Sequence, residues 1–207
     1  MDIENLQLDI KDLDSDPIKQ FATWFNEAQK QTSMNYPNAM CLSTIDKEGF
    51  PDSRIVLLKE FSNSGFSFFT NTDSTKGQSL LKYKHCALNF YWDDLHRQIR
   101  IQGEVSLVND DNADEYFKSR PRDSQIGAHA SLQSEELENR LKLEERFQNI
   151  KNQYNEIDVP RPKNWSGFIV KPFRIEFWQE RASRLHDRFI YDLNKNTKEW
   201  KITRRYP

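Results

Sequence analysis

Short apolar runs joined by glycine-containing turns are the feature of this sequence that most restricts its fold. Residues 39–45 lead through the turn 46–49 to residues 53–60, and the turn 62–65 leads on to residues 66–70. Turns of this composition join neighbouring antiparallel strands. Further strands are predicted at 86–92, 98–107, 167–170, 174–178, 189–193 and 200–203. The sequence therefore predicts an α+β fold in which a mostly antiparallel sheet forms a barrel with peripheral helices.

Helices are predicted where apolar residues recur at helical spacing or where a helix start is recognisable. Asp16 and Pro17 are typical of a helix start, and apolar residues recur through 17–31. Further helices are predicted at 76–82, at 109–119 and, from an N-cap at Ser134, as far as residue 154. The remaining expectations are a loop at 120–133, a mobile N-terminal arm at 1–15 and one domain over 16–207.

The bulk composition limits the classes of protein to which the chain can belong. The net charge is −2, whereas nucleic-acid-binding domains are usually strongly basic. No apolar run approaches the roughly 20 residues that span a bilayer, and the first residues lack the basic and apolar segments of a signal peptide. The two cysteines, Cys41 and Cys86, show no metal-binding or redox spacing. We therefore expect a soluble, cytoplasmic protein that binds neither nucleic acid nor membranes.

Aromatic residues make up 13 % of a chain whose apolar content is only 36 %. Each ring buries a large area, so the core can be built despite the modest apolar content. The combination also suggests that part of the core lies between subunits.

Three segments carry cations in places where an anion could bind. Residues 54–59 (RIVLLK) read as a strand with a cation at each end, and 69–77 place hydroxyls and Lys76 at a helix start. Residues 120–128 carry two arginines, whose guanidinium groups offer a planar fork of donors to phosphate. If these segments do not bind anions, residues 54–59 are an ordinary core strand, residues 69–77 a plain helix cap and residues 120–128 a solvated loop.

A fourth segment, 184–188 (RLHDR), combines two arginines with an imidazole and a carboxylate. His186 could exchange a proton near neutral pH, and Asp187 could fix an arginine or the imidazole. The alternative is a surface cluster of ion pairs. Together the four segments favour an enzyme that handles small phosphorylated molecules.

These segments also carry a resemblance to a known family. RIVLLK at 54–59, YFKSRPRDSQIGA at 116–128, and IEFWQ followed by RLHDRF within 175–189 resemble the pyridoxamine 5′-phosphate oxidase family, in the same order and over about residues 16–207. The resemblance implies an FMN-binding split barrel and a homodimer with FMN at the subunit interface. It also implies oxidation of pyridoxamine or pyridoxine 5′-phosphate by dioxygen to pyridoxal 5′-phosphate and hydrogen peroxide.

The resemblance assigns roles to individual residues. It implies contacts to FMN from Arg54, Ile55, Val56, Leu57, Leu58, Lys59, Phe69, Thr70, Lys76, Gln98, Gln133, Ser134, Trp178 and Arg188. It implies contacts to the substrate from Lys59, Tyr116, Arg120, Ser124, Arg184, Leu185 and His186. Arg184 and His186 are the expected catalytic pair, with Arg184 holding the substrate and His186 assisting by hydrogen bonding. No metal ligand is expected.

The sequence departs from the family pattern at several positions, and two other functions stay open. Thr75 stands where a second phosphate-binding arginine is common, Phe69 lacks a usual tyrosine hydroxyl, and His129 replaces a common tryptophan. The first alternative function is a related split-barrel FMN oxidase acting on another substrate, such as a phenazine precursor. The second is a flavin or pyridoxal-phosphate binding module without catalysis. The first is disfavoured by the substrate-phosphate residues Lys59, Tyr116, Arg120 and Ser124, and the second by Arg184 and His186.

Overall fold

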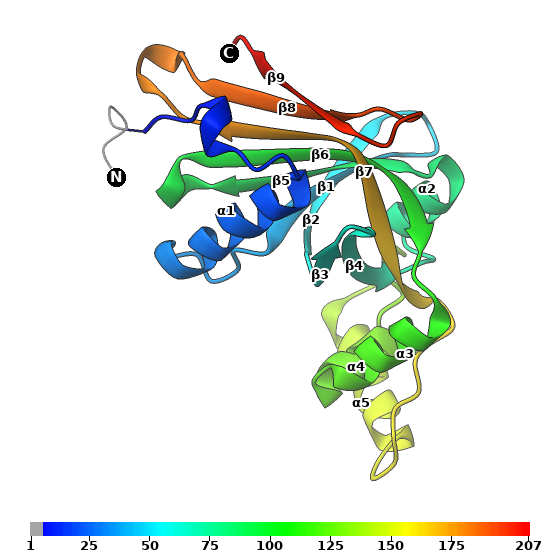
Figure 1. Cartoon of the computed structure of the whole chain (residues 1–207). Coiled ribbons are helices and arrows are strands. Elements are labelled where there is room, and N and C mark those ends of the chain that lie inside the picture. Colours follow the sequence, from blue (N-terminus) through cyan, green and yellow to red (C-terminus); the bar gives the residue numbers. More distant parts are fainter. Residues whose placement is uncertain (1–5) are drawn as a thin grey trace.

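The computed structural model describes residues 6–207, which form one nine-stranded antiparallel sheet with helices at its edges (Figure 1). The strands are β1 (Ala39–Ile45), β2 (Pro51–Leu57), β3 (Glu60–Ser62), β4 (Gly65–Asn71), β5 (His85–Trp92), β6 (Arg97–Leu107), β7 (Trp165–Gln179), β8 (Asp187–Leu193) and β9 (Trp200–Arg205). The helices are α1 (Pro17–Gln31), α2 (Thr75–Tyr83), α3 (Asp110–Ser119), α4 (Arg122–Ala130) and α5 (Arg140–Gln153), with short 3-10 turns η2 (Ile10–Asp12), η3 (Asp93–Leu95) and η4 (Ala182–Arg184). The predicted antiparallel α+β architecture is confirmed.

Strand β7 organises the sheet because it pairs with three other strands. The hydrogen-bonded order is β2-β1-β5-β6-β7-β4-β3, and β8 and β9 extend from β7. The first part of β7 pairs with β4, its last part pairs with β8, and β6 runs along its other side. The sheet therefore splits beyond β7 into two branches, which curl to enclose the core.

The two predicted strands 167–170 and 174–178 are in fact one strand, so that prediction was wrong. Pro172 lies between them. In the structure Pro172 stands opposite Gly103, where the register between β6 and β7 shifts. A bulge tolerates a proline because one residue is already outside the regular ladder.

Helix α1 covers the open end of the main core. The Asp16 carboxylate accepts a hydrogen bond from the Ile18 amide at 2.8 Å, and Pro17 opens the first turn, as predicted. Phe21 is fully buried and meets the rings of Phe66 and Phe90 edge-on, at centroid distances of 4.8 and 5.2 Å. The aromatic residues therefore do form the core of the barrel.

The segment between α3 and β7 differs from the sequence prediction in two places. Residues 122–130, predicted as loop, form α4, because Ile126 and Ala130 are one turn apart and both buried. Ser134 does not cap a helix. It has a φ of 77°, and α5 begins only at Arg140, where the Asn139 side chain accepts from the Lys142 amide.

The first described residues lie against the barrel. Leu8 is buried and its amide donates to the Asp187 carboxylate at 3.1 Å. The Tyr191 hydroxyl donates to the Asp14 carbonyl at 2.7 Å. The expected mobility of the arm 1–15, of which residues 1–5 lie outside the described part, and the single domain over 16–207 stay predictions. No helix in the described chain has both the length and the apolar character needed to cross a membrane.

Candidate active site

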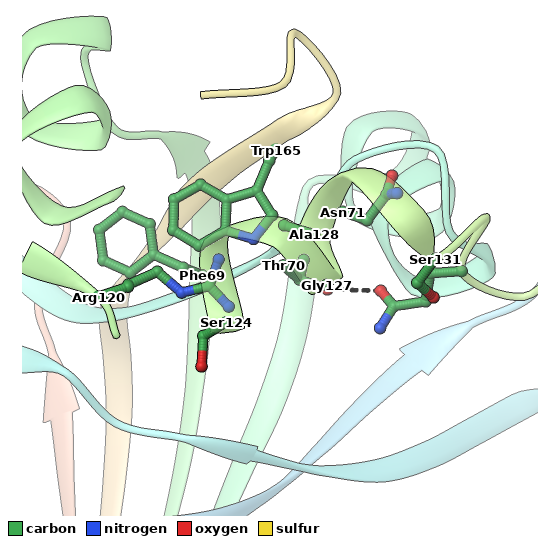
Figure 2. A pocket seen from close by; sticks show the side chains of 10 residues that line it. Phe69, Thr70, Asn71, Arg120, Ser124, Gly127, Ala128, Ser131 and Trp165 are labelled. Atoms are coloured by element: carbon green, nitrogen blue, oxygen red, sulfur yellow. Dashed lines mark hydrogen bonds between the residues drawn. The ribbon is translucent and has the colours of Figure 1, made fainter. Parts of the chain in front are cut away.

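A cavity opens where the end of β2, strand β4 and helices α3 and α4 meet. It has a volume of about 540 Å³ and is lined by Ile55, Val56, Leu57, Lys59, Phe69, Thr70, Lys76, Tyr116, Ser119, Arg120, Pro121, Ser124, Gln133 and Trp165. A second hollow of about 370 Å³ continues from it toward Asn71, Gly127, Ala128 and Ser131 (Figure 2). The structure thus brings together predicted site residues from segments 54–59, 69–77 and 116–133.

Stacked aromatic rings form one wall of this cavity. Phe69 contacts both Tyr116 and Trp165, with centroid distances of 4.1 and 5.2 Å and nearly parallel planes, and Tyr116 and Trp165 lie 6.1 Å from each other. Lys59 lies over the Tyr116 ring at 5.7 Å and Arg120 over the Trp165 ring at 4.7 Å. The wall therefore carries cations along flat apolar surfaces, which suits a planar anionic ligand.

Arg120 is a half-buried cation without a counter-ion in the described chain. Within residues 6–207 it forms no ion pair, and its Nη1 atom is buried without a hydrogen-bond partner. Burial lowers the pKa of Arg120 because the charged form loses water. Figure 2 shows the side chain running along the aromatic wall above Ser124. A buried donor of this kind is costly unless a ligand satisfies it, so the site fits an oxyanion such as phosphate.

A second group of donors surrounds the start of α2. The Lys76 amino group donates to the Gln133 side-chain oxygen at 3.0 Å, and the Thr70 hydroxyl donates to the same oxygen at 3.1 Å. The Ser134 hydroxyl accepts from the Thr75 amide at 3.3 Å. The structure therefore gathers Thr70, Lys76, Gln133 and Ser134 at one helix N-terminus, where backbone amides favour an anion.

The surroundings of Lys76 disfavour its positive charge in the absence of a bound anion. Burial lowers its pKa first, and the positive charge of Arg54 lowers it further, while Asp52 acts in the opposite direction. Arg54 itself pairs with Asp52 and donates to the Thr44 hydroxyl at 2.7 Å. Because Lys76 has no carboxylate partner in the described chain, a bound phosphate would supply the missing counter-charge.

Segment 54–59 is only partly a strand. Strand β2 ends at Leu57, so the expected alternation of faces stops before Lys59. Leu58 points into the core and is 4 % exposed, whereas Ile55 is 66 % exposed. Ile55, Val56, Leu57 and Lys59 line the cavity, while Arg54 and Leu58 do not.

The other predicted residues lie on a different face, which we call the outer sheet face. Gln98 of β6, Trp178 of β7 and Arg188 of β8 stand directly opposite one another in a single cross-strand row. Their neighbours Ile99 and Phe177 are fully buried in the core. Since alternate residues of a strand point to opposite faces, the row Gln98–Trp178–Arg188 faces away from the core.

The turn between β7 and β8 presents Arg184, Leu185 and His186 next to this row. Arg184 has a φ of 61°, a left-handed conformation, and both Arg184 and Leu185 are exposed. The His186 ring lies 4.6 Å from the Trp178 ring and accepts a hydrogen bond from the Arg181 amide at 3.2 Å. The turn therefore holds His186 against the outer sheet face and leaves Arg184 in solvent.

A single chain does not bring these two groups together. Trp165 lines the cavity at one end of β7, and Trp178 lies near the other end. The two residues are therefore separated by roughly 40 Å along the extended strand. Figure 1 shows α3 and α4 at the opposite end of the molecule from the β7–β8 turn. The predicted site residues thus form two half-sites, which we call the cavity half and the turn half.

Comparison with known proteins finds two matching regions in the chain. Residues 26–154 match the family Pyridoxamine 5′-phosphate oxidase, and residues 165–207 match the Pyridoxine 5′-phosphate oxidase C-terminal dimerisation region. The chain belongs to the pyridoxamine 5′-phosphate oxidase family. Most of the turn half falls in the dimerisation region, and the cavity half in the preceding match.

Members of this family resemble the chain along nearly its whole length. A pyridoxine/pyridoxamine 5′-phosphate oxidase from Aliarcobacter butzleri is 46 % identical over all of both chains. One from Bartonella henselae is 49 % identical over 92 % of each. Among solved structures, PhzG from Burkholderia lata, in complex with tetrahydrophenazine-1-carboxylic acid, is 26 % identical with a TM-score of 0.90 over all of both chains. An FMN-binding relative from Nostoc punctiforme, 15 % identical over 90 % of this chain and 95 % of its own, shares the split-barrel fold with a TM-score of 0.71.

Two residues, one beside each half-site, were not singled out from the sequence. Trp165 lines both hollows and lies under Arg120. Glu176 is buried on the outer sheet face between two arginines. An acidic residue in a strand that is otherwise apolar, IEFW, was the signal for Glu176. Trp165 had no such signal, because its position depends on the pairing of β4 with β7.

Proposed function

We propose that this protein is an FMN-dependent oxidase that converts pyridoxine 5′-phosphate or pyridoxamine 5′-phosphate into pyridoxal 5′-phosphate. Two copies form a homodimer, and each site combines the cavity half of one copy with the turn half of the other. The proposal is supported by the membership of the family and by the match of residues 165–207 to a dimerisation region.

One observation carries the substrate assignment: the buried Nη1 atom of Arg120 has no partner in the described chain. Lys59 and Ser124 line the same cavity, so three donors can converge on one phosphate. A phosphorylated substrate satisfies them, whereas an uncharged one leaves Arg120 desolvated and unpaired. Tyr116 lines the same cavity and belongs with Lys59, Arg120 and Ser124 to the group that contacts the substrate phosphate.

The residues at the start of α2 fit the phosphate of FMN. Thr70, Lys76, Gln133 and Ser134 offer hydroxyl, amine and amide groups beside a helix N-terminus. In the dimer, Gln98, Trp178 and Arg188 of the second copy complete the flavin site. When bound, FMN supplies the redox chemistry by accepting two electrons and a proton from the substrate and passing them to dioxygen.

The overall reaction balances for both substrates. The alcohol and dioxygen give the aldehyde and hydrogen peroxide, and the amine needs one water in addition and releases ammonia. Arg184 of the second copy holds the substrate with its reacting carbon toward the flavin. His186 donates or accepts a hydrogen bond at the substrate's polar group and acts by orientation rather than as an obligatory base.

A second candidate function is supported by the TM-score of 0.90 with PhzG. In that case the substrate is a tricyclic phenazine precursor, and a carboxylate takes the place of the phosphate at Arg120. The higher identity to pyridoxine/pyridoxamine 5′-phosphate oxidases, 46 to 49 %, favours the first candidate. The ratio of kcat/KM for pyridoxine phosphate and for tetrahydrophenazine-1-carboxylic acid separates the two.

The purified protein is expected to be yellow, with one FMN per subunit. Anaerobic addition of pyridoxine phosphate should bleach the flavin absorption, and air should restore it. A colourless protein that FMN cannot reconstitute would contradict the proposal. Free cysteines at Cys41 and Cys86 support a reducing, cytoplasmic location for this reaction.

A further inference from the structure

A buried carboxylate joins two arginines on the outer sheet face. The side chain of Glu176, on β7, is 7 % exposed. One of its oxygens accepts from Arg188 Nε at 2.7 Å, and the other accepts from Arg100 Nη1 at 3.1 Å. Arg100 stands directly opposite Glu176 on β6, and Arg188 lies on β8.

We propose that Glu176 is a positioning residue, which holds the Arg188 guanidinium in the orientation that binds the cofactor. This inference rests on the proposed function, because it takes Arg188 as a flavin contact. Glu176 itself lines no part of the cavity half and need not touch the flavin.

The hydrogen bonds of Arg188 show how the orientation is set. Its Nε donates to Glu176 and its Nη1 donates to the Tyr206 carbonyl at 2.9 Å. A guanidinium is planar, so two bonds in fixed directions determine its plane and rotation. Within residues 6–207, Nη2 has no partner, and its donors are therefore the ones available to a ligand.

Arg100 completes the arrangement by fixing the carboxylate from the other side. With one oxygen bound to Arg100, the Glu176 carboxylate cannot rotate freely, and its second oxygen stays directed at Arg188. Arg100 is 53 % exposed, whereas Arg188 is only 25 % exposed. The more exposed arginine thus anchors the carboxylate, and the less exposed one is oriented by it.

A positioning role and a purely electrostatic role of Glu176 predict opposite changes in FMN affinity when its negative charge is removed. FMN is an anion, so a carboxylate beside Arg188 repels it. If charge alone mattered, Glu176→Gln would bind FMN more tightly. If Glu176 orients Arg188, the same variant binds FMN more weakly, because the amide can accept from only one arginine and presents its own donors to the other.

The test measures FMN affinity directly, by quenching of FMN fluorescence on titration with dimeric apoprotein. We expect Glu176→Gln to raise the FMN Kd about tenfold, which corresponds to about 1.4 kcal/mol. Arg188→Met should raise it at least as much. The double variant should be no weaker than Arg188→Met alone, because Glu176 acts through Arg188.

Glu104→Gln is the matched control. Glu104 lies on β6 and pairs with Lys195 at 3.7 Å near the surface, away from both half-sites. Its FMN Kd should equal that of the wild type. Thermal unfolding and sedimentation of each apoprotein check that the variants fold and dimerise. If Glu176→Gln does not fold, Glu176→Asp replaces it, with an expected Kd severalfold above the wild type.

The outcomes separate the two proposals. Wild-type protein that binds no FMN overturns the proposed function, and the positioning role falls with it. If the wild type binds FMN, an unchanged or tighter Kd in Glu176→Gln overturns only the positioning role. Additive losses in the double variant also overturn it, because they would show that Glu176 acts independently of Arg188.

Discussion

The cavity half and the turn half of the site handle their cations differently. In the cavity half, Lys76 and Arg120 are each about half-buried, and burial is the main cause of their lowered pKa values. In the turn half, Arg188 is already paired with a carboxylate, and Arg184 is exposed. The cavity half therefore offers cations without a carboxylate partner to an anion within a single chain. The turn half offers one arginine that is already paired and one that is exposed to solvent.

This difference indicates separate tasks for the two halves. Desolvated, unpaired cations give up little further hydration when a phosphate arrives, so the cavity half suits binding. An exposed arginine on a tight turn contributes little until a second copy encloses it. We therefore expect substitution of Arg120 in the cavity half to affect mainly the affinity for the substrate, and substitution of Arg184 in the turn half to affect mainly the rate.

The largest expected effect comes from Arg184→Ala in the turn half. Misplacing the reacting carbon by about 1 Å can reduce the rate about 10²-fold. Anaerobic flavin reduction in a single turnover, at saturating substrate, should slow by that order, while FMN content stays unchanged. Arg174→Ala, an exposed arginine on β7 paired with Asp192, is the control. Wild-type reduction rates in Arg184→Ala would remove Arg184 from the mechanism.

Mixed dimers test the division between the halves most directly. In a heterodimer of an Arg120→Ala chain and an Arg184→Ala chain, one site carries both defects and the other carries neither. The purified heterodimer should therefore recover about half of the wild-type kcat/KM, although kcat/KM is impaired in each homodimer.

A heterodimer of Arg120→Ala and Lys59→Ala is the control for this experiment. Both substitutions lie in the cavity half, so each site keeps one defect and no recovery is expected. Equal behaviour of the two heterodimers would show that the halves do not combine across the dimer.

Arg120→Ala should mainly weaken substrate binding. The variant loses a charge-assisted hydrogen bond to the phosphate, which corresponds to roughly a tenfold or greater rise in KM. FMN should stay bound, because the donors around α2 are separate. Loss of FMN with an unchanged KM for pyridoxine phosphate would show that the two phosphate sites have been exchanged.

The smallest effect is expected for Trp165→Phe. The ring lies 4.7 Å from the Arg120 guanidinium, and phenylalanine offers a weaker face to a cation. We expect KM to rise about threefold with kcat unchanged, since a cation–π contact contributes about 0.5–1 kcal/mol. Trp200→Phe, on β9 away from the cavity, should leave both constants at their wild-type values.

The elements with regular patterns could be predicted from the sequence. Helix α1 and most strands followed from apolar spacing and turn residues, and the barrel followed from the hairpin order. Helix α4 was missed because Pro121 and nearby charges resemble a loop, while Ile126 and Ala130 give only one turn of apolar spacing. The length of β7 was missed because a sequence does not show that Pro172 stands at a bulge.

The site was predictable as a set of residues but not as an arrangement. The motifs named Lys59, Lys76 and Arg120, and the structure gathers them around one cavity. That Arg184 lies far from them within the chain depends on the register of β6, β7 and β8. Register is set by long-range pairing, which local patterns do not encode.

The length of β7 has a consequence for engineering. In the proposed homodimer, the two ends of β7 serve different catalytic centres, and each centre depends on two such strands contributed by separate polypeptides. A single-residue deletion within the strand would reverse the faces of all residues beyond it and would impair both centres at once. A monomeric enzyme could therefore not be obtained by trimming this chain, because it would require a second copy of the β7–β8 turn fused within reach of the first cavity.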